Sequence, residues 1–120
     1  MFNSVTLVGR LTRDAEVSEI HNDKKTPVVR FTLAVDRDYK NSDGKTATDF
    51  WPVQVFGEYG TKLAPHLLRG RLVLVTGEAH LDSRKDDAGE YHNYASIVAR
   101  QIRLLDRPKR EDREPGEDQE

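Results

Sequence analysis

The sequence of 120 residues contains no cysteine and no long run of apolar residues. The absence of cysteine excludes a disulfide framework and a zinc site built on thiolates. A helix that crosses a membrane needs about 18 or more consecutive apolar residues, and no segment approaches that length. The first residues also lack the basic stretch, apolar stretch and small-residue cleavage site of a secretory signal. We therefore expect a cytoplasmic protein with no membrane partner.

An excess of positive charge, which would indicate attraction to nucleic acid over the whole surface, is also missing, since the net charge is −2. Residues 1–106 carry 15 basic and 15 acidic side chains, whereas residues 107–120 carry four basic, six acidic and no apolar ones. A segment of that composition cannot offset the entropy of ordering. We expect one domain over residues 1–106 and a short acidic disordered tail over residues 107–120. The tail is either an inert solubilising end or a segment that competes for a basic groove or recruits a partner.

Signatures of catalysis and of metal binding are absent as well. Residues 57–60 have neither the spacing nor the lysine of a phosphate-binding loop. The four histidines are scattered, without a pair at helical ligand spacing. The serines lack the context of a nucleophile elbow, and the neighbouring acids at 36/38 and 86/87 are typical of solvated turns. We expect neither an enzyme nor a protein with a metal or another cofactor.

What the sequence does contain is a series of alternating apolar and polar residues, typical of half-buried strands. The pattern predicts strands over residues 3–11, 28–35, 48–56, 72–81 and 91–105, with a weak continuation of the first near residues 17–20. A hairpin turn is predicted at Asp43-Gly44, a charged loop over residues 82–90, and a bend or bulge at Gly77. Residues 58–68 form the one helix candidate, shortened by Pro65. Such strands with one short helix after the third are typical of a small, partly open Greek-key barrel.

Aromatic side chains alternate with cations on this framework. Phe50 and Phe56 have the parity opposite to the aliphatic residues of their strand, which places them on the face away from the core, and Tyr39 lies near a hairpin end. A base stacked on such a ring contributes about 1–3 kcal/mol. The alternative is that both phenylalanines fill a second apolar layer against a partner subunit or the helix. Candidate phosphate-binding cations are Arg30, Lys40, Lys45, Arg84 and Lys85.

The single tryptophan, Trp51, has the parity of the aliphatic residues on its strand. This indicates a place in the core or at a subunit interface. A slip of the strand at Pro52 would instead rotate Trp51 onto the outer face.

Four segments together resemble bacterial single-stranded DNA-binding proteins. They are 5–14 (VTLVGRLTRD), 31–35 (FTLAV), 49–57 (DFWPVQVFG) and 63–77, which contains LLRGRLVLVTG. The resemblance runs in order from about residue 5 to residue 105. It implies an all-β, five-stranded Greek-key OB-fold barrel that assembles as a homotetramer. It also implies coating of single-stranded DNA without sequence specificity during replication, recombination or repair.

The resemblance carries over to individual positions. It implies that Tyr39, Phe50 and Phe56 stack on bases, and that Arg84 stands where relatives have a further stacking ring. A guanidinium can still stack on a base or bind a phosphate. The chain ends in Glu-Asp-Gln-Glu and lacks the Ile-Pro-Phe anchor with which the family recruits replication and repair proteins. Two alternatives stay open. One is an accessory protein of the primosome that mainly contacts other proteins, which the replacement of the usual tryptophans by Tyr39, Phe50 and Arg84 favours slightly. The other is a structural or RNA-binding domain, since rings and cations alone do not distinguish DNA from RNA.

Overall fold

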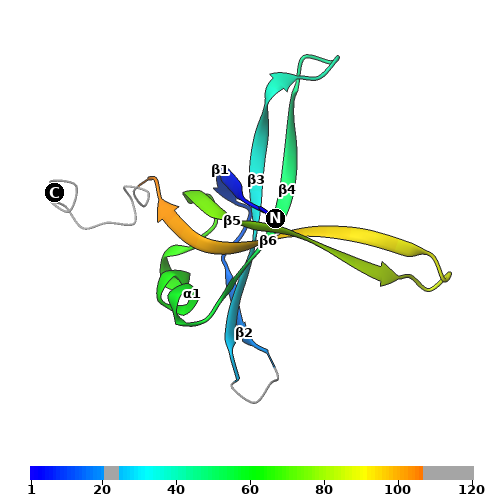
Figure 1. Cartoon of the computed structure of the whole chain (residues 1–120). Coiled ribbons are helices and arrows are strands. Elements are labelled where there is room, and N and C mark those ends of the chain that lie inside the picture. The colour runs from blue at the N-terminus through cyan, green and yellow to red at the C-terminus, as the bar shows by residue number, and fades with distance from the viewer. Residues whose placement is uncertain (21–24, 107–120) are drawn as a thin grey trace, which may run out of the picture.

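The computed structural model describes residues 1–20 and 25–106 of the chain. Within these residues the structure consists mainly of strands, with one α-helix and one short 3-10 helix (Figure 1). The elements in chain order are β1 (Val5–Leu11), β2 (Glu16–Glu19), β3 (Pro27–Lys40), β4 (Thr46–Phe56), α1 (Glu58–Leu63), η1 (Ala64–His66), β5 (Leu72–Lys85) and β6 (Tyr91–Leu104). The five predicted strands are all present, and the weak pattern near residue 17 is a separate strand, β2.

Five of the strands close into a barrel. The neighbours in the sheet are β1, β5, β6, β4 and β3, and a short pairing of β1 with β3 completes the ring. The β4–β6 pairing is parallel, and the other pairings are antiparallel. Strand β2 lies outside the ring, on the free edge of β3. This is the Greek-key barrel of the OB fold with one extra strand, as the sequence predicted.

The core lies inside the ring and follows the alternation of the strands. Leu33 on β3, Val53 and Val55 on β4, and Ile97 on β6 are almost fully buried there. Trp51 is partly buried and packs against this cluster, so its ring is on the core side of β4. Phe50 and Phe56 point the other way, because successive side chains of a strand alternate between its two faces.

Two glycines permit the close approaches that the barrel needs. A Cβ at Gly9 would collide with the carbonyl group of Ala34, where β1 reaches β3 to close the ring. A Cβ at Gly77 would collide with the carbonyl group of Val98, at a register shift between β5 and β6. The predicted irregularity at Gly77 is thereby confirmed. Its cause is the contact between two backbones, which leaves no room for a side chain.

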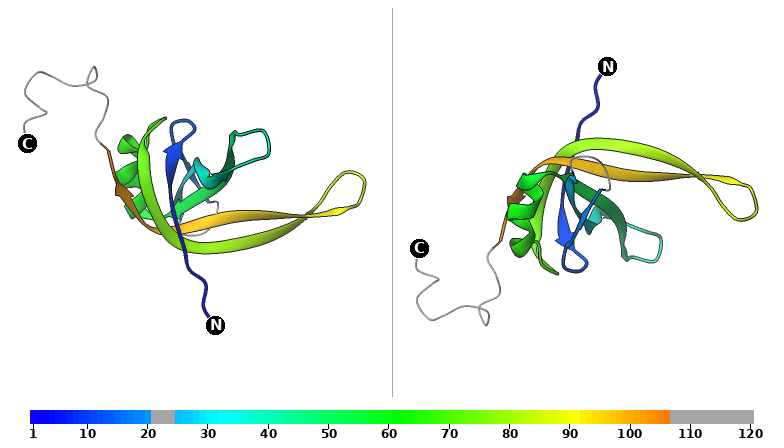
Figure 2. Two further views of the ribbon diagram at one scale, coloured as in Figure 1. Left: turned by 90° about the horizontal axis from the view of Figure 1, so that it is seen from above. Right: turned by 90° about the horizontal axis from the view of Figure 1, so that it is seen from below.

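The helix is shortened, as Pro65 predicted, and covers only the first part of the candidate range 58–68. Helix α1 ends at Leu63, and Ala64–His66 continue as the 3-10 helix η1. Pro65 lacks an N–H and so cannot extend the α-helical hydrogen-bond ladder, which accounts for the change. The helix is tied to the barrel by Tyr59, whose hydroxyl oxygen accepts a hydrogen bond of 2.9 Å from the backbone N–H of Ile102. Figure 2 shows the helix on the side of the barrel away from the tips of the long hairpins.

Two hairpins extend beyond the barrel, β3–β4 and β5–β6 (Figures 1 and 2). The β5–β6 hairpin, called the arm below, remains paired as far as Lys85 opposite Tyr91. The prediction of a loop starting at residue 82 was therefore wrong, and only the segment beyond Lys85 turns. In a hairpin that projects from the barrel, charged side chains on both faces stay solvated. The sequence then lacks the alternation of apolar and polar residues that predicts a strand, although the two strands still pair.

Candidate nucleic-acid interface

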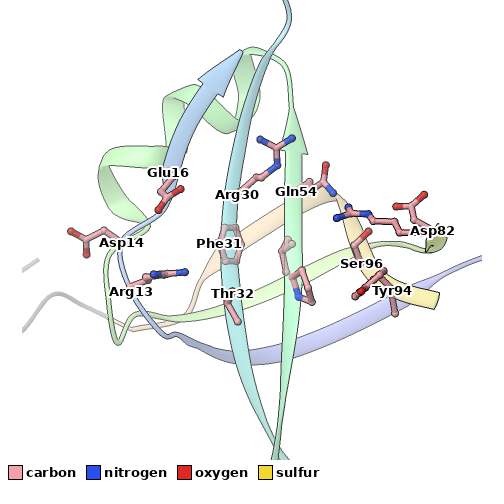
Figure 3. A pocket seen from close by; sticks show the side chains of 14 residues that line it. Arg13, Asp14, Glu16, Arg30, Phe31, Thr32, Gln54, Asp82, Tyr94 and Ser96 are labelled. Carbon is pink, nitrogen blue, oxygen red and sulfur yellow. The ribbon is translucent and has the colours of Figure 1, made fainter. Parts of the chain in front are cut away.

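A groove of about 400 Å³ lies on the outside of the β3–β4 pair. Arg30 and Thr32 of β3 with Pro52 and Gln54 of β4 belong to its floor. Figure 3 shows Arg13, Asp14 and Glu16 on one side of this strand pair and Asp82, Ser96 and Tyr94 on the other. Arg84 also lines the groove. Residues far apart in the sequence, from the start of β2 to the arm, therefore meet at one surface.

The charges of the groove are balanced. It is lined by the three cations Arg13, Arg30 and Arg84 and by the three carboxylates Asp14, Glu16 and Asp82. Two of these groups have structural bonds: Arg30 donates a hydrogen bond of 3.0 Å to the Ser18 hydroxyl, and Asp14 accepts one of 2.9 Å from the backbone N–H of Arg69. Such a lining gives a phosphate chain little net attraction, whereas it leaves room for flat, uncharged groups.

Phe50 and Phe56 flank the groove floor on the outer face of β4. Their exposed fractions are 63% and 39%, high for phenylalanine. They lie on either side of Pro52 and Gln54 on the same face, six residues apart, which corresponds to about 20 Å along a strand. The structure thus brings these two predicted residues together in one row. In the single chain, no second apolar layer covers either ring among the described residues.

Tyr39 belongs to a different surface of the β3–β4 hairpin. Its hydroxyl oxygen accepts a hydrogen bond of 2.9 Å from Nη1 of Arg37, and Arg37 binds both carboxylate oxygens of Asp49. Asp49 has the same strand parity as Trp51, so Tyr39 is held on the side opposite to Phe50. The hydrogen bonds from Arg37 lower the pKa of Asp49, and the same carboxylate raises the pKa of Arg37. Lys40 and Lys45 are exposed near the tip of this hairpin.

The arm contributes an aromatic residue that sequence reasoning missed. Tyr94 is 49% exposed and lines the groove, and the guanidinium carbon of Arg84 lies 5.2 Å from the centre of its ring. The argument from strand parity that selected Phe50 applies equally to Tyr94. Its parity on β6 is opposite to that of the buried Ile97, so its side chain points away from the core. Lys85 lies on the other face of the arm, where its ammonium group is 5.8 Å from the ring centre of Tyr91.

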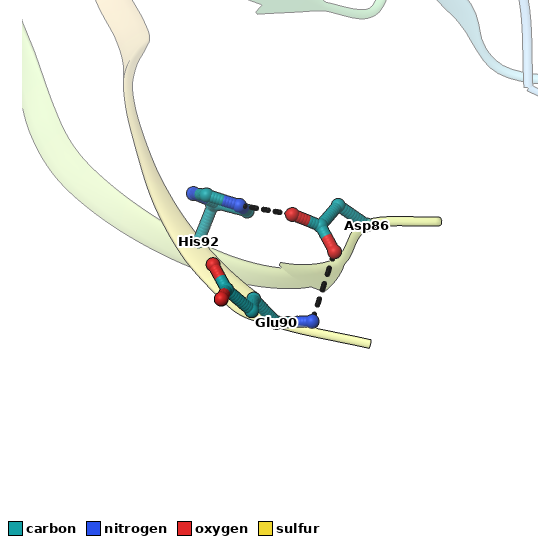
Figure 4. A group of neighbouring side chains, drawn as sticks. All are labelled: Asp86, Glu90 and His92. Carbon is teal, nitrogen blue, oxygen red and sulfur yellow. Dashed lines mark hydrogen bonds and ion pairs between the residues drawn. The ribbon is translucent and has the colours of Figure 1, made fainter. Parts of the chain in front are cut away.

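Three side chains that can ligate a cation gather at the tip of the arm, namely Asp86, Glu90 and His92 (Figure 4). All three are exposed. Asp86 also binds the turn: Oδ2 is 2.6 Å from Nε2 of His92, and Oδ1 accepts hydrogen bonds from the backbone N–H groups of Ala88 and Glu90. The bond to His92 is the main cause of the lowered pKa of Asp86, followed by the backbone bonds. These contacts are those of a side chain that stabilises a hairpin turn.

A closed five-stranded barrel of this topology places the chain in the class of OB-fold proteins, whose sheet face and loops bind oligonucleotides or oligosaccharides. The model of the single-strand binding protein family matches residues 2–105, and the chain belongs to this family. Helices long and apolar enough to cross a membrane are not found among the described residues.

Several relatives carry the name single-stranded DNA-binding protein. The one from Thermotoga maritima is 40% identical over 108 residues, which cover 88% of this chain and 75% of that protein. The one from Caldanaerobacter subterraneus subsp. tengcongensis is 37% identical over 106 residues, which cover 88% of this chain and 69% of that protein. The one from Aquifex aeolicus is 34% identical over 122 residues, which cover 100% of this chain and 81% of that protein.

Proposed function

We propose that this protein binds and coats single-stranded DNA without sequence specificity, in replication, recombination or repair. The observation that carries the proposal is the row of exposed rings on the outer face of β4, beside a groove, in a chain of the single-strand binding protein family. Rings of this kind stack on any base, because every base has a π-face. The function is binding alone, with no bond made or broken, and it needs no cofactor.

In this proposal the bases face the protein. Phe50 and Phe56 stack on bases along the groove, and Tyr39 stacks on a base where the strand passes the β3–β4 hairpin. Because cations and carboxylates balance in the groove, the phosphates gain little from entering it. The backbone instead lies toward the solvent, near Arg30 and Arg84 at the groove.

The remaining cations lie outside the groove. Lys40 and Lys45 meet the backbone near the tip of the β3–β4 hairpin. Lys85 is on the far face of the arm, so its predicted contact requires the strand to pass around the arm.

The assembly and the partners are also part of the proposal. A homotetramer in the cytoplasm, associated with the nucleoid, would present several such grooves to one strand. The acidic segment over residues 107–120, predicted to be a disordered tail, lies outside the described residues. Replication and repair proteins are the partners that membership of this family makes plausible.

The test is a titration against labelled oligo-dT of increasing length at two salt concentrations, with duplex DNA and a matched RNA oligomer as controls. Binding that tightens with length for single-stranded DNA and is weak for duplex and RNA supports a coating protein. Equally weak binding to all oligomers would contradict it and favour an accessory role through protein contacts. Stronger binding to RNA would favour a site that reads the 2′-hydroxyl group.

A further inference from the structure

Two uncharged side chains of the groove have hydrogen-bonding groups that the protein itself does not use. Ser96 on β6 is only 8% exposed and lines the groove. Gln54 on β4 is partly buried and lines it too. Among the described residues, neither the Ser96 hydroxyl nor the Gln54 amide has a hydrogen-bond partner. A buried polar group usually has one, so both groups are available to a ligand in the groove.

Asp82 adds a free carboxylate beside Ser96. In the β5–β6 ladder Asp82 is opposite Tyr94, and Ser96 is opposite His80, two positions away. Asp82 and Ser96 are therefore diagonal neighbours on the same face of the arm. Figure 3 shows both on the same side of the groove. The Asp82 carboxylate has no hydrogen-bond or ion-pair partner among the described residues, so it is also available to a ligand.

We propose that Asp82, Ser96 and Gln54 bind the edge of one base of the strand and favour a base with an exocyclic amino group over thymine. Such bases are cytosine, adenine and guanine. The inference rests on the proposed function and adds a preference to it, because stacking alone tolerates every base. The unstacked bases of a single strand expose their edges to hydrogen bonds of this kind.

The carboxylate determines the direction of the preference. An ionised carboxylate only accepts hydrogen bonds, and an exocyclic amino group donates two. An amino group can therefore donate to Asp82 while an acceptor atom of the same base receives a hydrogen bond from Ser96 or Gln54. Thymine has no amino group. Its one N–H donor lies between two carbonyl oxygens, and a carboxylate that approaches this donor is repelled by both.

Oligo-dC and oligo-dU of equal length are the matched probes. Cytosine and uracil have the same ring and differ only at the edge that carries the amino group of cytosine. In a slightly alkaline buffer we expect the unsubstituted protein to bind oligo-dC at least about 5-fold more tightly than oligo-dU, the lower end of the range for a specific base contact. Equal affinities, or tighter binding of oligo-dU, would overturn the proposal.

Asp82→Asn separates the contact with the base edge from the effect of charge. An amide both donates and accepts, so the preference for oligo-dC is expected to fall below about 2-fold. The lost negative charge strengthens the contacts with phosphates to the same degree for both oligomers, and it cancels in the ratio of affinities. Glu16→Gln is the matched control, since it removes one charge on the opposite side of the groove. A ratio that falls equally in both variants, or in neither, would contradict the proposal.

Ser96→Ala tests the buried hydroxyl group. This hydroxyl has no partner among the described residues, so its removal leaves no protein group unpaired and the midpoint of thermal unfolding should not fall. We expect Ser96→Ala to weaken binding of oligo-dC more than binding of oligo-dU. An equal effect on the two oligomers would contradict a role of Ser96 at the base edge.

A failure of this inference is distinguishable from a failure of the proposed function. Phe50→Ala is titrated with the same two oligomers. If the unsubstituted protein binds both equally and Phe50→Ala weakens both, coating by stacking is intact and the base preference alone is refuted. Weak binding of both oligomers by the unsubstituted protein would contradict the proposed function, and the inference with it.

Discussion

Arg37 binds Asp49 through two parallel hydrogen bonds of 2.9 Å, one to each carboxylate oxygen, across the β3–β4 hairpin. A third nitrogen–oxygen contact, also 2.9 Å, joins the same guanidinium to the hydroxyl group of Tyr39. The position of a predicted stacking ring is therefore set by an ion pair. Because the pair is solvent-exposed, its effect is expected on the hairpin and not on the stability of the barrel.

The first prediction concerns this ion pair. Arg37→Lys keeps the charge but loses the planar fork, so Tyr39 is released from its position. We expect weaker binding of oligo-dT, with the midpoint of thermal unfolding almost unchanged. Tyr39→Phe keeps the ring and removes only this hydrogen bond, so it is expected to weaken binding to a similar degree while leaving the ion pair in place. If Arg37→Lys lowers the unfolding midpoint without affecting DNA binding, the ion pair has a structural role only.

The pair also predicts a dependence on pH. The pKa of Asp49 is lowered in the folded protein by the hydrogen bonds from Arg37. The contribution of the Asp49 carboxylate to the stability of the hairpin is complete above its unfolded pKa of about 3.9. This contribution is lost as the pH falls through the lower pKa of the folded protein. We expect the amide protons of the β3–β4 hairpin to be less protected from exchange below that value in the unsubstituted protein, when each rate is compared with the intrinsic rate at the same pH. In Asp49→Asn, exchange in this hairpin should depend less on pH, and a full pH response there would contradict the assignment.

A second prediction tests the row of rings on β4. The double substitution Phe50→Ala/Phe56→Ala removes two stacking platforms, which is expected to weaken binding of single-stranded DNA by about 2–6 kcal/mol. Fluorescence anisotropy with labelled oligo-dT measures the change. Leu68→Ala is the matched control, because Leu68 is a 47% exposed apolar residue that does not line the groove. Unchanged affinity in the double variant would remove the stacking row from the interface.

A third prediction uses the balanced charges of the groove. Glu16 and Asp82 line the groove, and among the described residues their side chains have no hydrogen-bond or ion-pair partner. Glu16→Gln and Asp82→Asn therefore remove a negative charge without breaking a bond. Both are expected to tighten binding at low salt and to make its salt dependence steeper, since the free cations then meet the phosphates unopposed. Glu58→Gln, on helix α1 at the side away from the hairpin tips, serves as the control. Weaker binding in both groove variants would show that the carboxylates contact the bases.

The tip of the arm gives a fourth prediction. The bonds from His92 and from the backbone amides lower the pKa of Asp86 in the folded hairpin. The carboxylate therefore orders the turn above the unfolded pKa of about 3.9, and this order is lost as the pH falls through the folded value. Nuclear magnetic resonance of the Glu90 amide is the measurement. We expect its shift to titrate with Asp86, and Asp86→Asn to abolish that titration. A shift that still titrates in the variant would point to another group.

The fifth prediction concerns barrel closure. Gly77→Ala places a methyl group against the backbone of Val98, where no flexible side chain can give way. We expect a loss of about 1–3 kcal/mol in the free energy of unfolding, as for an overpacked core. Gly44→Ala is the comparison, because its Cβ meets open space and only the positive φ of 77° opposes the substitution. Equal losses in chemical denaturation would mean that backbone strain and not the contact is limiting.

The alternation of residues along the chain determined much of this molecule by itself. A period of two assigns each side chain to a face, and so it separated Phe50 and Phe56 from the core and placed Trp51 against it. The irregularity at Gly77 and the shortening of the helix at Pro65 could also be predicted, because the effects of glycine and proline on the backbone are local. These features depend on neighbouring residues only, and the five strands with a shortened helix follow from them.

Only the tertiary structure decided which strands meet and how far they remain paired. The register of β5 against β6 places Arg84 beside Tyr94 and sends Lys85 to the other face, although 84 and 85 are adjacent in the sequence. The groove joins residues of β3 and β4 to the arm, and its balanced charge is visible only when they are together. Pairings between distant segments are set by the packing of the whole core and by loop closure, which no local pattern contains.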